Sequence, residues 1–292
     1  MSSLAVAVPR AAPSTQRHAA QALIRDPWAL AAVTFLAIVI LAAVLAPLLV
    51  PDTVNNPDFR ARLKPPLTPD HLLGTDQLGR DVFDRMLLGA RVSLTVGFVA
   101  VFLSAVIGIP IGMLAGYFGG WLDVVLMRLA DVQLSIPFIL LALTINAIIG
   151  LGLQNIIITL VIVGWVEYAR IARGEILVTR EREFVQAATL AGCSPARILA
   201  RHLFPNIVTP LIVIGTLQVA RFIIAEASIS FLGFGVQPPT PAWGSMVSEG
   251  LDYIFAAWWL ITFPGLALAL VALAVNTTGD WLRDTLDPRL KR

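Results

Sequence analysis

Long apolar stretches separated by short polar segments are the main pattern of this sequence. They run over residues 29–50, 92–118, 131–150, 154–171, 207–234 and 256–277. A helix needs about 20 apolar residues to cross the hydrocarbon core of a bilayer, and each stretch is close to that length or longer. The pattern therefore predicts an all-α membrane protein with six transmembrane helices.

The third and fourth spans are inferred from a fold-back. No charged residue lies between Asp131 and Glu167. A single helix over this run would be about 50 Å long, which is far more than a bilayer core requires. Residues 150–155 read Gly-Leu-Gly-Leu-Gln-Asn, a composition typical of a turn. We therefore expect two spans that meet at this turn.

Composition agrees with a protein dissolved in membrane lipid. Hydrophobic residues make up 57% of the chain and charged residues 14%, whereas a soluble domain carries about 25% charged residues. The net charge of +2 is too small to indicate a nucleic-acid partner. Cys193 is the only cysteine, so the chain cannot form an internal disulfide.

The basic residues predict the orientation in the membrane. An even number of spans places both ends of the chain on one side, and lysine and arginine favour the cytoplasmic side. With the termini inside, the inner loops and chain ends hold most of the basic residues, and the outer loop 235–255 holds none. We expect both termini in the cytoplasm.

The loop 173–204 is the longest cytoplasmic segment in this arrangement. Its apolar side chains recur at the spacing of one helical face: Phe184, Ala187, Ala188 and Ala191. Glu183 suits the N-terminal end of that helix, and Gly192 stands where a C-terminal cap belongs. Ser194 and Pro195 predict the start of a second helix, which Pro205 is expected to end.

This loop resembles the coupling loop of importer-type ABC permeases. In that family the motif is Glu-Ala-Ala, three residues, glycine, and then Leu-Pro near the next span. The chain matches it in register, with Gln186 and Phe204 in place of the glutamate and the leucine. The resemblance implies that the helix docks in a groove of an ATPase subunit. The residues concerned are Glu183, Gln186, Ala187, Ala188, Gly192 and Pro205.

Four other segments are similar to the C subunits of dipeptide, oligopeptide and nickel permeases. They are 71–81 (HLLGTD and GRD), 226–233 (EASISFLG), 237–244 (QPPTPAWG) and 279–289 (GDWLRD and DPR). The resemblance implies a type I ABC importer permease of the inner (plasma) membrane. Its cargo would be di- or oligopeptides or a related solute such as a nickel chelate or glutathione. Its partners would be a second homologous permease, two ATP-binding cassette subunits and an extracytoplasmic substrate-binding protein.

The same resemblance divides the chain into four parts. Residues 1–27 match nothing in the family and are expected to form a disordered cytoplasmic leader. Residues 28–90 hold the first span and an external loop with an amphipathic helix. Residues 91–281 form the transmembrane core with the coupling loop, and 282–292 form a cytoplasmic tail.

The sequence offers no means of hydrolysing ATP. A phosphate-binding loop needs glycine-rich backbone followed by lysine, and neither of the two lysines, Lys64 and Lys291, follows such a segment. The chain is therefore expected to be a transport subunit and not an enzyme. It would hold no cofactor, and partner ATPase subunits would bind ATP and Mg²⁺.

Charged residues inside the fifth span are candidates for the translocation path, because each is costly in lipid. Arg221 follows Gln218 by one turn and precedes Glu226 by five residues. Five residues turn a helix by about 140°, so Arg221 and Glu226 do not share a face and each needs another partner. Arg221 either attracts a substrate carboxylate or forms a structural ion pair. Glu167 lies near a cytoplasmic end, where a charge is tolerated without a functional role.

The outer loop 71–91 combines histidine, aspartates and arginines. Arg80 with Asp84 and Asp81 with Arg85 are spaced as i,i+4 pairs, which predicts an amphipathic helix that lies on the membrane or against the other spans, and not a metal site.

One alternative from a different class stays open at this point. An ion-coupled secondary transporter or channel acting as a homodimer would need coupling carboxylates or broken helices at mid-membrane. Only Arg221 and Glu226 are candidates for such groups at mid-membrane.

Overall fold

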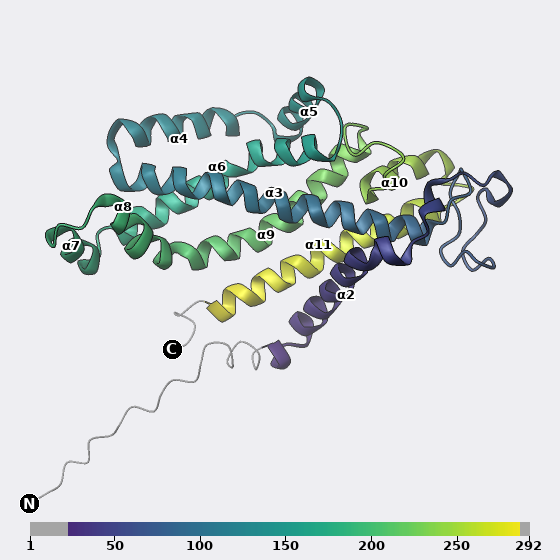
Figure 1. Cartoon of the computed structure of the whole chain (residues 1–292), viewed down its shortest axis with the longest axis horizontal. Helices are drawn as coiled ribbons and strands as arrows, with labels where there is room; N and C mark the ends of the chain where they lie inside the picture. Colours follow the sequence, from purple (N-terminus) through teal and green to yellow (C-terminus); the bar gives the residue numbers. More distant parts are fainter. Residues whose placement is uncertain (1–22, 287–292) are drawn as a thin grey trace, which may run out of the picture.

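The computed structural model describes residues 23–286, and every regular element in this part of the chain is a helix (Figure 1). The long helices are α2 (Pro27–Leu49), α3 (Val82–Phe118), α6 (Leu153–Thr179), α9 (Phe204–Phe231) and α11 (Trp259–Leu286). The shorter ones are α4 (Gly120–Leu134), α5 (Phe138–Ile149), α7 (Glu183–Leu190), α8 (Pro195–Arg197) and α10 (Trp243–Gly250), together with the single turns η1 (Asp52–Asn55), η2 (Phe59–Ala61), η3 (Ile198–Leu203) and η4 (Leu251–Tyr253). This confirms the predicted all-α class.

Five helical segments among the described residues are long and apolar enough to cross a membrane, and a bent helix pair makes a sixth crossing if it is counted as one span. It consists of α4 and α5, which meet at an angle of 92°. The predicted third span, 131–150, was wrong in its start and did not include this break. Gly119, with φ of 63°, ends α3 and lets the chain turn straight into α4. Pro137 then prevents α4 from continuing, because proline has no N–H to donate.

The remaining spans were predicted with inexact ends. α6 extends past the predicted 171 and α11 past the predicted 277, so α11 enters the segment expected to be a tail. Residues 1–22 of the expected leader lie outside the described residues. α2 begins close to its predicted start, where the Asp26 carboxylate accepts hydrogen bonds from the N–H groups of Trp28 (3.0 Å) and Ala29 (3.1 Å).

Pro205 does not end the second helix of the cytoplasmic loop, contrary to the prediction. The chain stays helical from Pro195 to Phe231 through α8, η3 and α9. η3 is a π-helical segment directly before Pro205. This wider turn accommodates a proline that would otherwise clash with the preceding turn of an α-helix.

A stripe of glycines brings α3 and α6 into backbone contact. Gly108, Gly112 and Gly116 recur every fourth residue and therefore lie on one face of α3. A Cβ atom at these positions would lie against carbonyl oxygens of α6: Trp165 O at 2.2 Å, Ala169 O at 2.1 Å and Arg173 O at 2.9 Å. Only glycine permits this approach, which is a common way for helices to pack in lipid. The pair forms the centre of the core, against which α9 packs.

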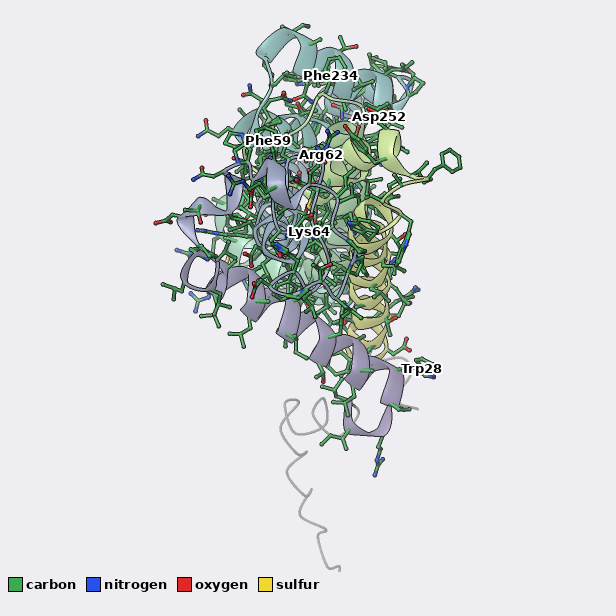
Figure 2. All side chains as sticks on the ribbon, turned by 90° about the vertical axis from the view of Figure 1, so that its right-hand side faces the viewer. Trp28, Phe59, Arg62, Lys64, Phe234 and Asp252 are labelled. Atoms are coloured by element: carbon green, nitrogen blue, oxygen red, sulfur yellow. The ribbon has the colours of Figure 1, made fainter. Side chains whose placement is uncertain are left out.

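The end of the molecule that carries the loop after α2, which was predicted to be the outer end, is held by a buried cluster of charges. Asp76 accepts hydrogen bonds from Arg80 Nε (2.7 Å) and Arg85 Nη1 (2.6 Å), and both arginines also contact Glu249 of α10 at 3.2 and 3.1 Å. Figure 2 looks onto this end, where Phe59, Arg62 and Lys64 of the loop after α2 are labelled. The cluster fixes this loop to α3 and α10.

The i,i+4 pairs predicted for this loop were wrong. The helix begins only at Val82, so Arg80 lies outside it. Asp81 is the N-cap of α3: its carboxylate accepts from the N–H groups of Phe83 and Asp84 and binds His71 Nδ1 at 2.8 Å. The amphipathic helix expected on the membrane or against the other spans is the first part of the long helix α3, which packs against α2 and α10.

α2 and α11 pack against each other in opposite directions. The start of α2 and the end of α11 therefore point toward the same end of the molecule as α7 (Figure 1). The orientation of these ends in the membrane stays a prediction.

Candidate functional site

The first candidate site is the short helix α7 at the end of the molecule opposite the charge cluster (Figure 1). Val185 is only 3% exposed and holds α7 against the segment that follows it. The predicted alanine-rich face points the other way: Phe184, Ala187 and Ala191 are exposed, and Ala188 is half-buried. An exposed apolar face on a short helix is what a partner groove needs.

Gly192 ends α7 in the left-handed conformation, with φ of 77°. The N–H of Gly192 donates to Thr189 O (3.0 Å) and that of Cys193 to Ala188 O (3.1 Å), which satisfies carbonyls at the helix end. No atom lies within 4 Å of a Cβ built at Gly192. The backbone conformation, and not space, is therefore what requires glycine here.

The other predicted coupling residues are spread around α7. Glu183 is the first residue of α7 and exposed, and the Gln186 amide donates to Glu181 O at 3.1 Å. Pro205 lies apart from α7, in the first turn of α9.

Two arginines that sequence reasoning left without a role make contacts near this loop, Arg180 between the end of α6 and α3 and Arg173 between α6 and α4. Arg180 Nη1 donates to Gly116 O (2.8 Å) in the last turn of α3. Arg173 Nη2 donates to Asp123 Oδ2 of α4 at 2.6 Å. Both contacts join segments that are far apart in sequence, so spacing carried no signal for them.

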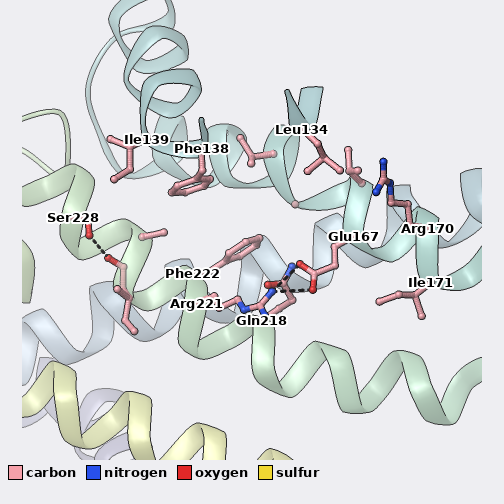
Figure 3. A pocket seen from close by; sticks show the side chains of 15 residues that line it. Leu134, Phe138, Ile139, Glu167, Arg170, Ile171, Gln218, Arg221, Phe222 and Ser228 are labelled. Carbon is pink, nitrogen blue, oxygen red and sulfur yellow. Dashed lines mark hydrogen bonds and ion pairs between the residues drawn. The ribbon is translucent and has the colours of Figure 1, made fainter. Parts of the chain in front are cut away.

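The second candidate site is a cavity of about 780 Å³ between the end of α4, α5, α6 and α9 (Figure 3). Its walls are mainly apolar, and five of its lining residues are charged or polar: Glu167, Arg170, Gln218, Arg221 and Ser228. Volume and lining are typical of a site for a small organic molecule.

Arg221 and Glu167 form an ion pair across this cavity. Arg221 Nη1 lies 2.9 Å from Glu167 Oε1 and 3.1 Å from Oε2. The side chains are 64% and 37% exposed, so the pair lies open to the cavity. Arg170 lies at its edge and pairs with Asp131. The prediction that Glu167 is a tolerated charge without a functional role did not include this contact, because it joins residues 54 positions apart in the sequence.

Glu226, the third candidate for the translocation path, does not line this cavity. Its side chain is fully buried, and its two oxygens accept hydrogen bonds from Ser93 Oγ of α3 (2.8 Å) and Ser230 Oγ (2.7 Å). The prediction that Arg221 and Glu226 need separate partners is confirmed. Of the three predicted path residues, Gln218 and Arg221 line the cavity.

Comparison with known families gives two matches. Residues 108–292 match the family described as binding-protein-dependent transport system inner membrane component. Residues 14–66 match the N-terminal TM domain of oligopeptide transport permease C.

Several curated proteins are similar over most of their length. A putative peptide transport system permease of Brucella suis is 47% identical, covering 88% of this chain and 86% of the relative. The dipeptide transport system permease of Alkalihalophilus pseudofirmus is 40% identical, with 95% and 91% covered. A glutathione transport system permease of Escherichia coli is also 40% identical, with 91% and 88% covered.

Among solved structures, the inward-facing MetNI methionine ABC transporter is similar in fold. A chain of it superposes with a TM-score of 0.58 and 21% sequence identity, covering 70% of this chain and 97% of that one. At this identity the likeness concerns the fold alone.

Proposed function

This chain belongs to the binding-protein-dependent transport system inner membrane component family, and from this membership we propose that it is the permease subunit of an ATP-driven ABC importer for peptides. The observation that carries the proposal is the similarity, over nearly the whole chain, to relatives named as peptide, dipeptide and glutathione permeases. The five or six apolar crossings and the likeness to an importer permease fold agree with it.

In the proposed mechanism this chain transmits motion and performs no covalent chemistry. The exposed face of α7 docks on an ATPase subunit, and ATP binding there moves α7. Arg180 connects the start of this loop to the last turn of α3, and η3 connects its end to α9. Because α9 lines the cavity, a displacement of α7 reaches the path and switches its access between the two sides of the membrane.

The assembly that we propose contains four kinds of subunit besides lipid. This chain pairs with a second homologous permease, two ATP-binding cassette subunits bind ATP and Mg²⁺, and an extracytoplasmic binding protein delivers the cargo. The positions of the basic residues support an orientation with both termini in the cytoplasm of a cell with an inner membrane.

The alternative of an ion-coupled transporter or channel acting as a homodimer has less support. Its candidate coupling carboxylate, Glu226, is fully buried on two serine hydroxyls and does not line the cavity. The broken crossing at α4 and α5 is the one feature that such a mechanism shares.

Affinity purification from the native membrane tests the proposal. The tagged chain is expected to bring down ATPase subunits, and the complex in liposomes should hydrolyse ATP faster when a peptide-loaded binding protein is added. A chain that purifies without ATPase subunits and moves peptide down an ion gradient would contradict the proposal and support the alternative.

Replacing Ala187 by glutamate is expected to uncouple transport from ATP hydrolysis. A charge placed in an apolar docking groove without a partner costs about 2 kcal/mol or more, which weakens binding roughly 30-fold. The exposed Ala187 does not support the fold of this chain, so membrane insertion should not change. The measurement is peptide-stimulated ATP turnover together with the amount of ATPase subunit retained on the permease.

Ala196 offers a matched control, since it is an exposed alanine of the same loop that lies on α8 and not on α7. Ala196→Glu should retain the ATPase subunits and the stimulated turnover. Normal stimulation in Ala187→Glu would refute the docking role of α7.

A further inference from the structure

We propose that Glu167, Arg221 and Gln218 recognise the backbone of a short zwitterionic peptide on the translocation path. Arg221 would bind the terminal carboxylate, Glu167 the terminal ammonium and Gln218 a peptide group. The inference deepens the proposed function and depends on it, because it assumes that peptides pass through the cavity. Its three side chains all line that cavity (Figure 3).

The ion pair leaves one edge of the arginine free. Arg221 uses Nη1 alone for both carboxylate oxygens of Glu167, at 2.9 and 3.1 Å. A guanidinium carries five N–H donors in a rigid fork. Nε and Nη2 of Arg221 have no hydrogen-bond partner within residues 23–286, and the side chain is 64% exposed. This second edge has the geometry for a bidentate bond to another carboxylate.

Glu167 makes the site selective for zwitterions over anions. An arginine alone in an apolar cavity would attract any anion, whereas the pair is neutral overall. A carboxylate has about four acceptor positions, and the contact with Arg221 leaves some of them for an ammonium group. A ligand that carries both charges therefore gains at both ends, and one that carries a single charge leaves the opposite member of the pair without compensation.

Gln218 supplies an independent observation at the same place. The residue is 3% exposed and lines the cavity one turn before Arg221. Its amide makes no hydrogen bond to the described part of the protein, and its nitrogen and oxygen are not among the fully buried unpaired atoms, so they are accessible from the cavity. A primary amide offers both donors and an acceptor, which complement the C=O and N–H of a peptide bond.

The rest of the cavity wall places few demands on the cargo side chains. Leu134, Phe138, Ile139 and Phe222 are apolar and lie around the polar group (Figure 3). Apolar walls offer contact area without directional bonds. Selection would therefore act on the charged ends and the peptide bond that all short peptides share, and only weakly on their side chains.

The test measures binding to the complete transporter in lipid nanodiscs, with the partner permease and ATPase subunits present and the binding protein left out. The probes are dialanine, N-acetyl-dialanine, which lacks the ammonium, and dialanine amide, which lacks the carboxylate. Wild type is expected to bind dialanine about tenfold more tightly than either blocked form, as the loss of one charged hydrogen bond predicts.

Substitution of either charged residue should remove one preference and keep the other. Glu167→Gln is expected to bind dialanine and N-acetyl-dialanine equally but still to discriminate against the amide. Arg221→Gln should lose the discrimination against the amide, and Arg221→Lys should restore part of it. Gln218→Leu should weaken the three probes alike, because all of them contain the peptide group.

Asp123→Asn is the matched control, since Asp123 and Arg173 also pair between helices but do not line the cavity. It should leave the probe preferences unchanged.

Equal binding of the three probes by wild type would overturn the inference. The inference would also be overturned if Glu167→Gln and Arg221→Gln each weakened the binding of all three probes equally and lowered the melting temperature. The ion pair would then only stabilise the packing of α6 against α9. Stimulation of ATP turnover by loaded binding protein is measured separately, and its absence in wild type would refute the proposed function instead.

Discussion

Gly112→Ala is expected to prevent stable packing of the two central helices, although it adds a single methyl group. The new Cβ would lie 2.1 Å from Ala169 O and within 3 Å of two further backbone atoms of the same residue. A side chain could rotate away from such a clash, but these are atoms of the α6 backbone. α3 and α6 would have to move apart along the contact that forms the centre of the core. We expect a loss at or above about 3 kcal/mol, the upper end of the cost of overpacking.

The thermal midpoint of the purified protein and the fraction that elutes as a single species are the measurements. Gly174→Ala provides the control, because Gly174 lies in α6, the partner helix of Gly112, but is exposed, with no atom within 4 Å of a Cβ placed there. That variant should be at least as stable as wild type, since alanine loses less backbone entropy in a helix. An unchanged midpoint for Gly112→Ala would mean that the backbones are not in contact at this position.

Asp76→Ala is expected to detach the outer loop from the helices. The Asp76 side chain is 2% exposed and accepts four hydrogen bonds: from Leu78 N (2.8 Å), Arg80 N (2.9 Å), Arg80 Nε (2.7 Å) and Arg85 Nη1 (2.6 Å). Its removal leaves two buried arginines that share Glu249 alone. Breaking a buried charge pair on one side costs about 3–5 kcal/mol.

A lower melting temperature and faster proteolysis within residues 50–81 would show the effect of Asp76→Ala. The control is Asp58→Ala in the same loop, because Asp58 is exposed and accepts only from Arg60 N at 3.0 Å. Loss of such an exposed cap costs about 1 kcal/mol. If the two variants were equally stable, the buried cluster would not hold the outer end together.

Features that depend on residues close together in the chain could be predicted. Apolar runs of sufficient length identified the crossings, since the bilayer thickness sets the length of a spanning helix. Gly192 was recognised as the end of α7 because a left-handed residue after a helix favours glycine whatever surrounds it. The angle between Arg221 and Glu226 followed from helix geometry alone.

Predictions failed where a local rule competed with packing. Arg80 and Arg85 have the spacing of helical partners for aspartates, but the helix begins after Arg80 and both arginines bind Asp76 instead. Pro205 has the position of a helix stop, but the π-helical turn before it keeps the chain helical. The tertiary contacts at these places outweighed preferences worth a few tenths of a kcal/mol to a few kcal/mol.

By itself the sequence determined that this protein lies in a membrane, where its long apolar helices run, and that the short helix α7 is followed by a left-handed glycine, Gly192. These properties follow from hydrophobicity and backbone geometry along a single segment. Only the tertiary structure decided that Arg221 meets Glu167, that Glu226 is enclosed by serines and that the glycines of α3 face carbonyls of α6. Such contacts depend on the height and rotation of one helix against another, which many side chains set together when the helices pack.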